Sequence, residues 1–187
     1  MVGQFLNGEL GTLETVDPHF AAMLYAGDRF EAKAGLTEAL NEGRVVLADR
    51  YIASNLAHQT ARVAAEKRAE FIAWIEHLEY GIYGLPREDL VVYLRVPAAE
   101  AQHLVTKKLA RSYTNAKQDL QESSLRHLEE AAEMYESLAR RNRWATVQCF
   151  NAARGTMRGR EDIAADVLAA IQGVVSGVSS HAGKQRT

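Results

Sequence analysis

The sequence predicts an α/β fold with a parallel sheet, and three observations support this. Short segments suited to strands occupy residues 45–48, 90–94 and 144–150. The first two are apolar runs rich in Val and Leu, which is typical of strands buried on both faces of a parallel sheet. Longer segments with a helical spacing of apolar residues alternate with these strands, which indicates crossover connections between parallel neighbours.

The first long helix is predicted over residues 18–41. Asp17 has the form of an N-cap, and Pro18 occupies the first helical position, where proline is favoured. Gly43 follows the predicted end, as glycine often does after a helix. After the strand at residues 45–48, Ser54 is predicted to cap a second long helical region that continues to about Tyr80.

The rest of the chain continues the alternation. Helices are predicted over residues 98–108, 119–141 and 162–175. Residues 110–118 are polar and lose periodicity, and residues 176–187 are small and polar, so this tail is predicted to be disordered. No repeat or linker divides the chain, and residues 1–175 are therefore predicted to form one domain.

Composition limits the partners and the compartment. The 187 residues carry a net charge of −2, without the basic excess expected of a nucleic-acid-binding protein. No apolar run approaches the roughly 18 residues that a membrane span requires, and the N-terminus lacks a signal-peptide pattern. The single Cys149 cannot form an internal disulfide, and the six histidines show no zinc-site spacing. These features predict a cytoplasmic protein that binds neither nucleic acid nor membrane.

Two charged residues follow the end of the first predicted strand. In parallel sheets the functional crevice lies beyond the C-terminal strand ends, and Asp49 and Arg50 follow such an end. An apolar strand that ends in Asp resembles a Walker B strand, whose carboxylate holds magnesium, although an acidic turn after a strand is the alternative. An Arg can clamp a phosphate with two parallel hydrogen bonds.

A polar helical face follows the charged pair. Asn55 is three and four positions from His58 and Gln59, so the three side chains share one face of a helix. Such a face could read the edge of a base and border a sugar. A polar face turned to solvent is the alternative.

Several segments together resemble one family. DRYIASNLAHQ, residues 49–59, closely resembles the DRY-x-x-S-x-x-A-[YH]-Q signature of thymidylate kinases. AMLYAGDRFEAK, residues 22–33, is similar to the family helix that carries an aromatic residue and an Arg. LPREDLVVYLRVPAAEA, residues 85–101, is similar to the P-x-x-DL-hydrophobic-YLDVP strand of the family. KKLARSYTNAKQDLQE, residues 107–122, is similar to its lid, with the lid at about residues 107–118. The resemblance extends over about residues 2–171.

The resemblance implies a three-layer parallel sheet of the P-loop kinase type. It also implies an enzyme that transfers the γ-phosphoryl group of ATP to dTMP with Mg²⁺, and a homodimer. For the base, it implies that Tyr25 stacks on thymine and that Arg29 hydrogen-bonds it. Asn55 and Gln59 would bind the base as well, and His58 would lie beside the 2′ position of the sugar.

The resemblance assigns further residues to the phosphates and the lid. Asp49 would lie near the magnesium ion and the transferred phosphate, directly or through water, and Arg50 would hold the acceptor monophosphate. Three basic lid residues are candidates for neutralising phosphate charge in the transition state, one of them catalytic, and two acidic residues match a pair near the sugar. These are Lys107, Lys108 and the catalytic candidate Arg111, and Asp119 and Glu122.

Two departures from the family pattern are expected to matter. Arg95 stands where the family strand has Asp, and the chain contains no Gly-x-x-x-x-Gly-Lys-[Ser/Thr] motif for donor phosphates. The chain is therefore expected to begin roughly 40 to 50 residues late and to lack the first strand, the P-loop, the first helix and the second strand. Without the first strand, the isolated chain is expected to be inactive and poorly stable, since two strands lose their shared neighbour. A non-catalytic remnant that binds nucleotide or dimerises, and a related kinase acting on another nucleoside or nucleotide, remain alternatives.

Overall fold

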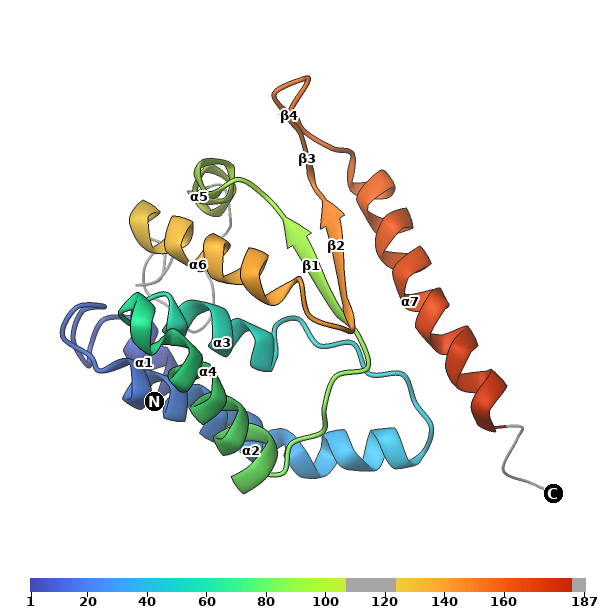
Figure 1. Cartoon of the computed structure of the whole chain (residues 1–187), viewed down its shortest axis with the longest axis horizontal. Coiled ribbons are helices and arrows are strands. Elements are labelled where there is room, and N and C mark those ends of the chain that lie inside the picture. Colours follow the sequence, from blue (N-terminus) through green and yellow to red (C-terminus); the bar gives the residue numbers. More distant parts are fainter. Residues whose placement is uncertain (107–123, 183–187) are drawn as a thin grey trace. The chain divides into compact units, whose positions relative to one another are not determined.

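The computed structural model describes residues 1–106 and 124–182, which belong to two compact units (Figure 1). The first unit comprises Met1–Arg87 and Ala98–Leu138, and the second comprises Glu88–Pro97 and Ala139–Thr187. The described part of the first unit is helical, and the strands lie in the second. The assignment of residues 1–175 to one domain stays a prediction.

The first unit begins with the short helix α1 (Val2–Leu6) and the long helix α2 (Pro18–Asn41). The start of α2 confirms the predicted cap, because Asp17 Oδ1 accepts hydrogen bonds from the backbone N–H groups of His19 at 2.7 Å and Phe20 at 3.4 Å. After the helix end, Gly43 has a φ of 75°, which glycine adopts without steric cost. Local chemistry at both ends therefore determines where this helix starts and stops.

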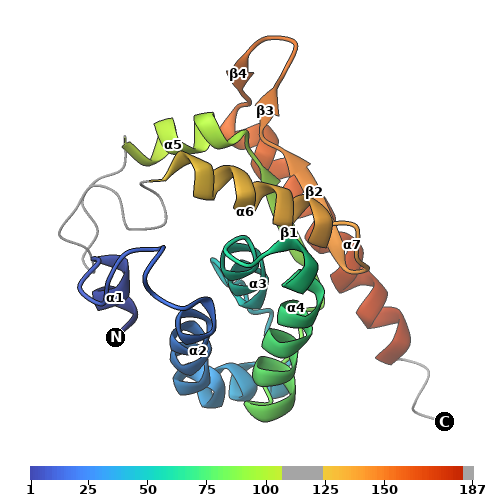
Figure 2. The same cartoon turned by 60° about the vertical axis from the view of Figure 1, so that its left-hand side comes forward.

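Helix α3 (Ile52–Thr60) is the centre of the first unit. It packs against both α2 and α6 (Leu125–Leu138), and Figure 2 shows α3 between them. All residues of α3 except Ser54 are buried, the polar ones included. Helix α5 (Ala98–Thr106) also packs on α6 and begins where the sequence predicts it.

The long helical region predicted from Ser54 to about Tyr80 is largely helical but is not one continuous helix. The segment divides into α3, the 3₁₀ turn η1 (Ala65–Lys67), α4 (Arg68–Glu76) and the π-helical turn η2 (His77–Ile82). Ala64 is extended, with φ of −55° and ψ of 142°, so it interrupts the helical path. Ser54 does not cap α3, which begins two residues earlier. Its hydroxyl instead accepts a hydrogen bond from the Tyr135 hydroxyl at 3.2 Å.

The strand predicted at residues 45–48 is also wrong. These residues are irregular and exposed, with Val45 71% and Leu47 82% accessible to solvent. A strand needs a neighbour for its N–H and C=O groups, and no strand of the described ranges pairs with this segment. An apolar pattern typical of a buried strand therefore lies open to water.

The second unit contains the predicted parallel pairing. Strands β1 (Val91–Arg95) and β2 (Trp144–Gln148) run parallel, with Val91 opposite Trp144 and Arg95 opposite Gln148. The chain continues through a small antiparallel pair, β3 (Phe150–Asn151) and β4 (Thr156–Met157), into helix α7 (Arg160–Ala182), which packs against β2. The structure is thus mixed α/β and mostly helical, which is consistent with a P-loop kinase fold, and the complete three-layer sheet stays a prediction.

Several helix bounds differ from the predicted ones. Helix α6 spans a shorter segment than residues 119–141, of which residues 119–123 lie outside the described ranges. Helix α7 begins two residues before the predicted start and continues beyond Val175.

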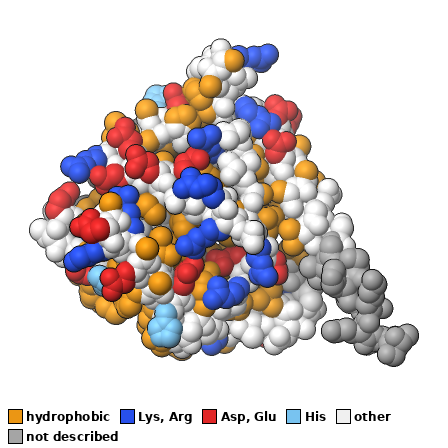
Figure 3. Space-filling model, viewed as in Figure 1, with side chains coloured by type: hydrophobic (Ala, Val, Ile, Leu, Met, Phe, Trp, Pro, Cys, Tyr) orange, Lys and Arg blue, Asp and Glu red, His pale blue; other side chains and the backbone are white. Residues whose placement is uncertain are grey.

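Over the viewed face of the molecule, acidic and basic side chains are interspersed, in line with the net charge of −2 (Figure 3). No helix within the described residues has the length and apolar character of a membrane span.

Candidate active site

The approach to α3 carries a strained residue. Arg50 has a φ of 69°, a left-handed conformation that costs a non-glycine residue about 1–2 kcal/mol. Its NH1 group donates a weak hydrogen bond to Ser54 Oγ at 3.4 Å, and the neighbouring Asp49 is exposed. Backbone strain of this kind concentrates at binding and catalytic sites. The strain at Arg50 therefore supports a functional role for the segment before α3.

A buried carboxylate joins α2 to α3. Glu79, in the π-helical turn η2, has no solvent-accessible surface. Its two oxygens accept hydrogen bonds from Arg29 Nε at 2.7 Å and from Arg29 NH2. The Oε1 atom also accepts from Asn55 Nδ2 at 2.8 Å. Two residues predicted to read the base, Arg29 and Asn55, thus meet on one carboxylate oxygen.

The surroundings of Asn55 determine which way its amide points. Its Nδ2 group also donates to the backbone oxygen of Ala22 at 3.1 Å, so two acceptors face the nitrogen. The opposite orientation would bring the amide oxygen against a carboxylate and a carbonyl, which repel it. The Oδ1 atom consequently points elsewhere, and it is buried without a hydrogen-bond partner among the described residues.

Tyr25 lies one helical turn before Arg29 on α2 and is half-buried. Its ring meets the ring of Phe5 edge to face, with centroids 6.1 Å apart. This contact belongs to a small apolar cluster of α1, α2 and the segment between them. The ring and the Arg29 guanidinium thus lie on the same side of α2.

A pair of histidines joins α3 to α6. His58 Nδ1 and His127 Nε2 are 3.2 Å apart and share a hydrogen bond inside the first unit. Burial places the pKa of His58 well below its ordinary value and lowers the pKa of His127 to about 4. Both imidazoles are therefore neutral at neutral pH. Tyr135 lies edge-on to His58, and burial raises the pKa of its hydroxyl.

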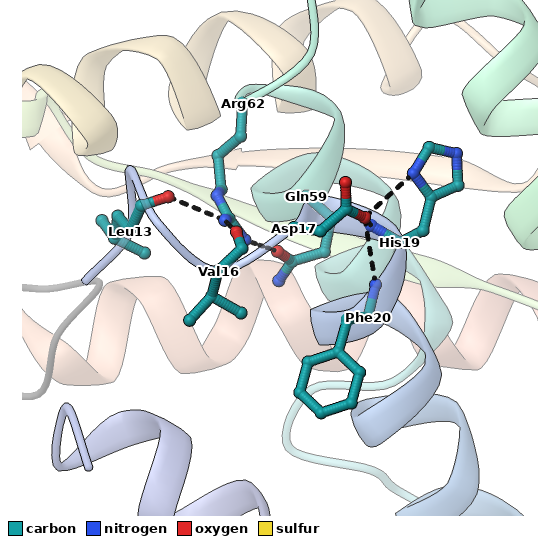
Figure 4. Close-up of polar contacts among 7 residues, drawn as sticks. All are labelled: Leu13, Val16, Asp17, His19, Phe20, Gln59 and Arg62. Carbon is teal, nitrogen blue, oxygen red and sulfur yellow. Dashed lines mark hydrogen bonds and ion pairs between the residues drawn. The ribbon is translucent and has the colours of Figure 1, made fainter. Parts of the chain in front are cut away.

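Arg62 ties the end of α3 to the segment before α2 (Figure 4). Its NH1 group donates to Gln59 Oε1 at 2.7 Å, and its NH2 group donates to the backbone oxygens of Leu13, at 2.7 Å, and Val16. Burial lowers the pKa of this guanidinium. The amide oxygen of Gln59 is occupied by Arg62, whereas its Nε2 atom is buried without a partner in the described part of the chain. Base binding by Gln59 stays a prediction.

Comparisons with known proteins identify the family of the chain. Residues 1–155 match the family model described as Thymidylate kinase. The chain belongs to the thymidylate kinase family.

Individual thymidylate kinases match over shorter segments. The chain is 34% identical over 98 residues to a thymidylate kinase of Mycobacterium tuberculosis, and the matched segment covers 52% of this chain and 45% of that protein. It is 36% identical over 89 residues to a probable thymidylate kinase of Pyrobaculum aerophilum, covering 47% and 42%, respectively. A thymidylate kinase of Dictyostelium discoideum is 31% identical over 100 residues, covering 54% and 41%. The chain therefore spans less than half the length of the curated relatives it matches.

Thymidylate kinases are phosphotransferases that use ATP and Mg²⁺, and one residue of the described part suits the ion. Asp49 is an exposed carboxylate, and Mg²⁺ is typically bound by one or two carboxylates together with water and substrate phosphates. The described residues contain no cluster of three or more His, Cys, Asp or Glu side chains that could hold a metal by itself. A single carboxylate that shares the ion with phosphates fits this donor set.

Some predicted site residues cannot be located, and others were missed. The five lid candidates of the family lie outside the described residues: Lys107, Lys108, Arg111, Asp119 and Glu122. Sequence reasoning missed Glu79 and His127, which hold predicted site residues in place. A signal for Glu79 exists, because Phe71, Ile75 and Glu79 follow one another at intervals of four and place a carboxylate on an apolar helical face.

Proposed function

We propose that this chain binds dTMP as the phosphate acceptor of a thymidylate kinase reaction. Arg29 and Asn55 would read the base and Arg50 would hold the monophosphate, while Tyr25 stacks on the ring. The observation that carries the proposal is the shared attachment of Arg29 and Asn55 to Glu79. In this arrangement Asn55 Oδ1 has no hydrogen-bond partner among the described residues, and the Arg29 guanidinium still has hydrogens to donate.

This pattern matches one edge of thymine. The base presents an N3–H donor next to the O4 acceptor, which complements Asn55 Oδ1 and the N–H groups of Arg29 that do not bind Glu79. Cytosine presents an N3 acceptor and an amino donor in the same places. Each mismatched buried group loses its partner, which costs about 1–3 kcal/mol. The arrangement thus favours thymine over cytosine.

The sugar and the phosphate have matching neighbours in the proposal. Burial lowers the pKa of His58, so a neutral imidazole would border the sugar. Arg50 is exposed and donates within the described contacts only weakly, to Ser54, which leaves most of its five N–H donors for phosphate oxygens. Its strained backbone holds the guanidinium in front of α3.

In-line transfer from ATP to dTMP needs mainly positioning and charge stabilisation. Arg50 would keep the acceptor phosphate in place, and Asp49 would lie near the magnesium ion and the transferred phosphate. Bound Mg²⁺ supplies neutralisation of phosphate charge. Lys107, Lys108 and Arg111 are proposed to add positive charge from the lid, with Asp119 and Glu122 near the sugar.

A homodimer is part of the proposal. Phe20, Met23 and Phe30 on α2 are more than a third exposed, which is a large apolar content for one helix facing water. Gel filtration with light scattering would report the mass. A monomer of 20.7 kDa at high micromolar concentration would remove this part of the proposal.

Equilibrium binding tests the central claim. Calorimetric titration with dTMP should show saturable binding, and Arg50→Ala should weaken it roughly 10- to 100-fold, since a charge-assisted hydrogen bond contributes about 1.5–3 kcal/mol. Arg44→Ala is the matched control, because Arg44 is an exposed arginine that pairs with Glu42. Absence of dTMP binding, or equal binding by wild type and Arg50→Ala, would contradict the proposal.

Formation of dTDP separates the kinase from its alternative, a non-catalytic nucleotide-binding or dimerising module. The chain has no Gly-x-x-x-x-Gly-Lys-[Ser/Thr] motif, so we expect it to bind dTMP without forming dTDP from ATP and Mg²⁺. Fusion behind the phosphate-binding segment of a thymidylate kinase should produce dTDP. Continued absence of dTDP in a fusion that binds both nucleotides would favour the alternative.

A further inference from the structure

A buried acidic residue outside the proposed substrate contacts binds the two groups that are proposed to read the base. Glu79 accepts three hydrogen bonds, two from Arg29 and one from Asn55, and is inaccessible to solvent. We propose that Glu79 is a positioning residue that sets the preference of this site for a pyrimidine with N3–H and O4 over one with an amino group. This inference rests on the proposed binding of dTMP.

The first step concerns the amide of Asn55. An asparagine amide can rotate by half a turn and exchange its donor and acceptor, so it discriminates bases only when its neighbours fix it. Here Glu79 Oε1 and the Ala22 oxygen both accept from Nδ2, at 2.8 Å and 3.1 Å. The backbone oxygen alone would hold one hydrogen. The carboxylate supplies the stronger, charge-assisted contact and makes the acceptor face of the amide the one available to a ligand.

The second step concerns the guanidinium of Arg29. Glu79 binds its Nε and NH2 groups side by side, which fixes the plane of the guanidinium. The NH1 group, with two hydrogens, lies outside this fork and does not bind Glu79. One carboxylate therefore fixes a donor and an acceptor in relation to each other, which is the pattern that distinguishes thymine from cytosine.

Exchange of Glu79 for its amide isostere separates this role from simple packing. In Glu79→Gln the volume is kept, but one acceptor becomes an amino donor. The remaining amide oxygen can keep the contacts with Asn55 Nδ2 and Arg29 NH2, and the introduced amino group then meets Arg29 Nε, which is a second donor, so the fork that fixes the guanidinium is broken. We expect dTMP affinity to fall at least roughly tenfold while dCMP affinity changes little, because the donor to O4 is no longer held in place and a neutral amide holds Asn55 less firmly than a carboxylate.

The experiment is calorimetric titration of the full chain with dTMP and with dCMP. Wild type should prefer dTMP at least roughly tenfold, and Glu79→Gln should bring the ratio of the two affinities close to one. Glu70→Gln is the matched control, since Glu70 is an exposed glutamate of α4, and it should keep the wild-type ratio. A purely structural role of Glu79 would weaken both nucleotides equally.

Each outcome decides a different point. If wild type does not bind dTMP, the proposed function fails. If wild type prefers dTMP and Glu79→Gln keeps the same ratio, the inference about Glu79 is overturned and the function stands. If circular dichroism shows that Glu79→Gln does not fold, hydrogen exchange in the wild-type protein tests the inference instead. The side-chain amide hydrogens of Asn55 should then exchange slowly with solvent, both in the free protein and in the dTMP complex. Rapid exchange in the complex would overturn the inference.

Discussion

Acidification should destabilise the first unit, because His58 and His127 are buried as a neutral pair. The perturbation is a change from pH 7 to pH 5. An unfolded chain protonates histidine near 6.5, whereas His127 in the folded chain has a pKa of about 4. Between these values the unfolded state binds more protons than the folded state. The free energy of unfolding therefore falls as the pH falls from about 7 towards 4.

The size of this effect follows from the two pKa values of His127. The interval from 6.5 to about 4 corresponds to a loss of roughly 3 kcal/mol once the pH reaches 4, and to about 2 kcal/mol by pH 5. Burial also lowers the pKa of His58, which acts in the same direction. A loss of this size is a large fraction of the roughly 5–15 kcal/mol that stabilises an ordinary domain.

Urea unfolding at pH 7, 6 and 5 measures this loss. Two carboxylates with lowered pKa values, Glu14 and Asp17, titrate below this range and do not disturb it. His127→Gln should reduce the loss between pH 7 and pH 5 by about 2 kcal/mol. The control is His77→Gln, at an exposed histidine, which should lose as much stability as wild type. An unchanged pH dependence in His127→Gln would refute the reasoning.

Three further substitutions concern the segment before α3 and the first residue of that helix. Arg50→Gly should keep the free energy of unfolding or raise it by up to about 1 kcal/mol, because glycine accepts the φ of 69° without strain, while dTMP affinity measured by calorimetry falls at least roughly tenfold. Leu47→Lys should change the free energy of unfolding by no more than about 0.5 kcal/mol, because the side chain is 82% exposed, whereas Ile52→Ala at a fully buried position should cost about 2–5 kcal/mol in the same urea experiment.

The sequence predicts elements well where the determining signals are local. The start of α2 depends on Asp17 and Pro18, which act within one helical turn, and both bonds of the cap are present. Strand β1 was predicted from a short apolar run and β2 from a short segment suited to a strand, and their parallel pairing followed from the alternation with helices. In these cases the chemistry that specifies the element lies inside the element.

The wrong predictions share a non-local cause. Residues 45–48 have the composition of a buried strand, but strand formation depends on a partner that no local pattern reveals. The breaks in the long helical region predicted after Ser54 have a similar cause. Periodicity continues across the break, while the path of the chain is set by contacts at the end of α3, where Arg62 bonds the segment before α2.

The candidate site divides in the same way. Asn55 and Arg50 were found because they belong to one continuous motif. Glu79 and His127 lie 24 and 69 residues from their partners in α3, and the sequence gives no spacing rule for such distances. Their roles follow only from three-dimensional packing, which brings η2 and α6 onto the same short helix.

Burial excludes one of the two interpretations of the polar face of α3, the one in which this face is turned to solvent. A solvated face would leave Asn55, His58 and Gln59 in water, yet all three are buried. Burial of a polar group without a partner costs about 1–3 kcal/mol, so each needs a compensating contact. His58 obtains its contact from α6, Gln59 Oε1 accepts from Arg62, and Asn55 Nδ2 donates to Glu79 and to the Ala22 oxygen. Gln59 Nε2 and Asn55 Oδ1 have no hydrogen-bond partner among the described residues. In the proposed binding mode, thymine would supply the partner of Asn55 Oδ1, and dTMP should therefore stabilise the chain against unfolding.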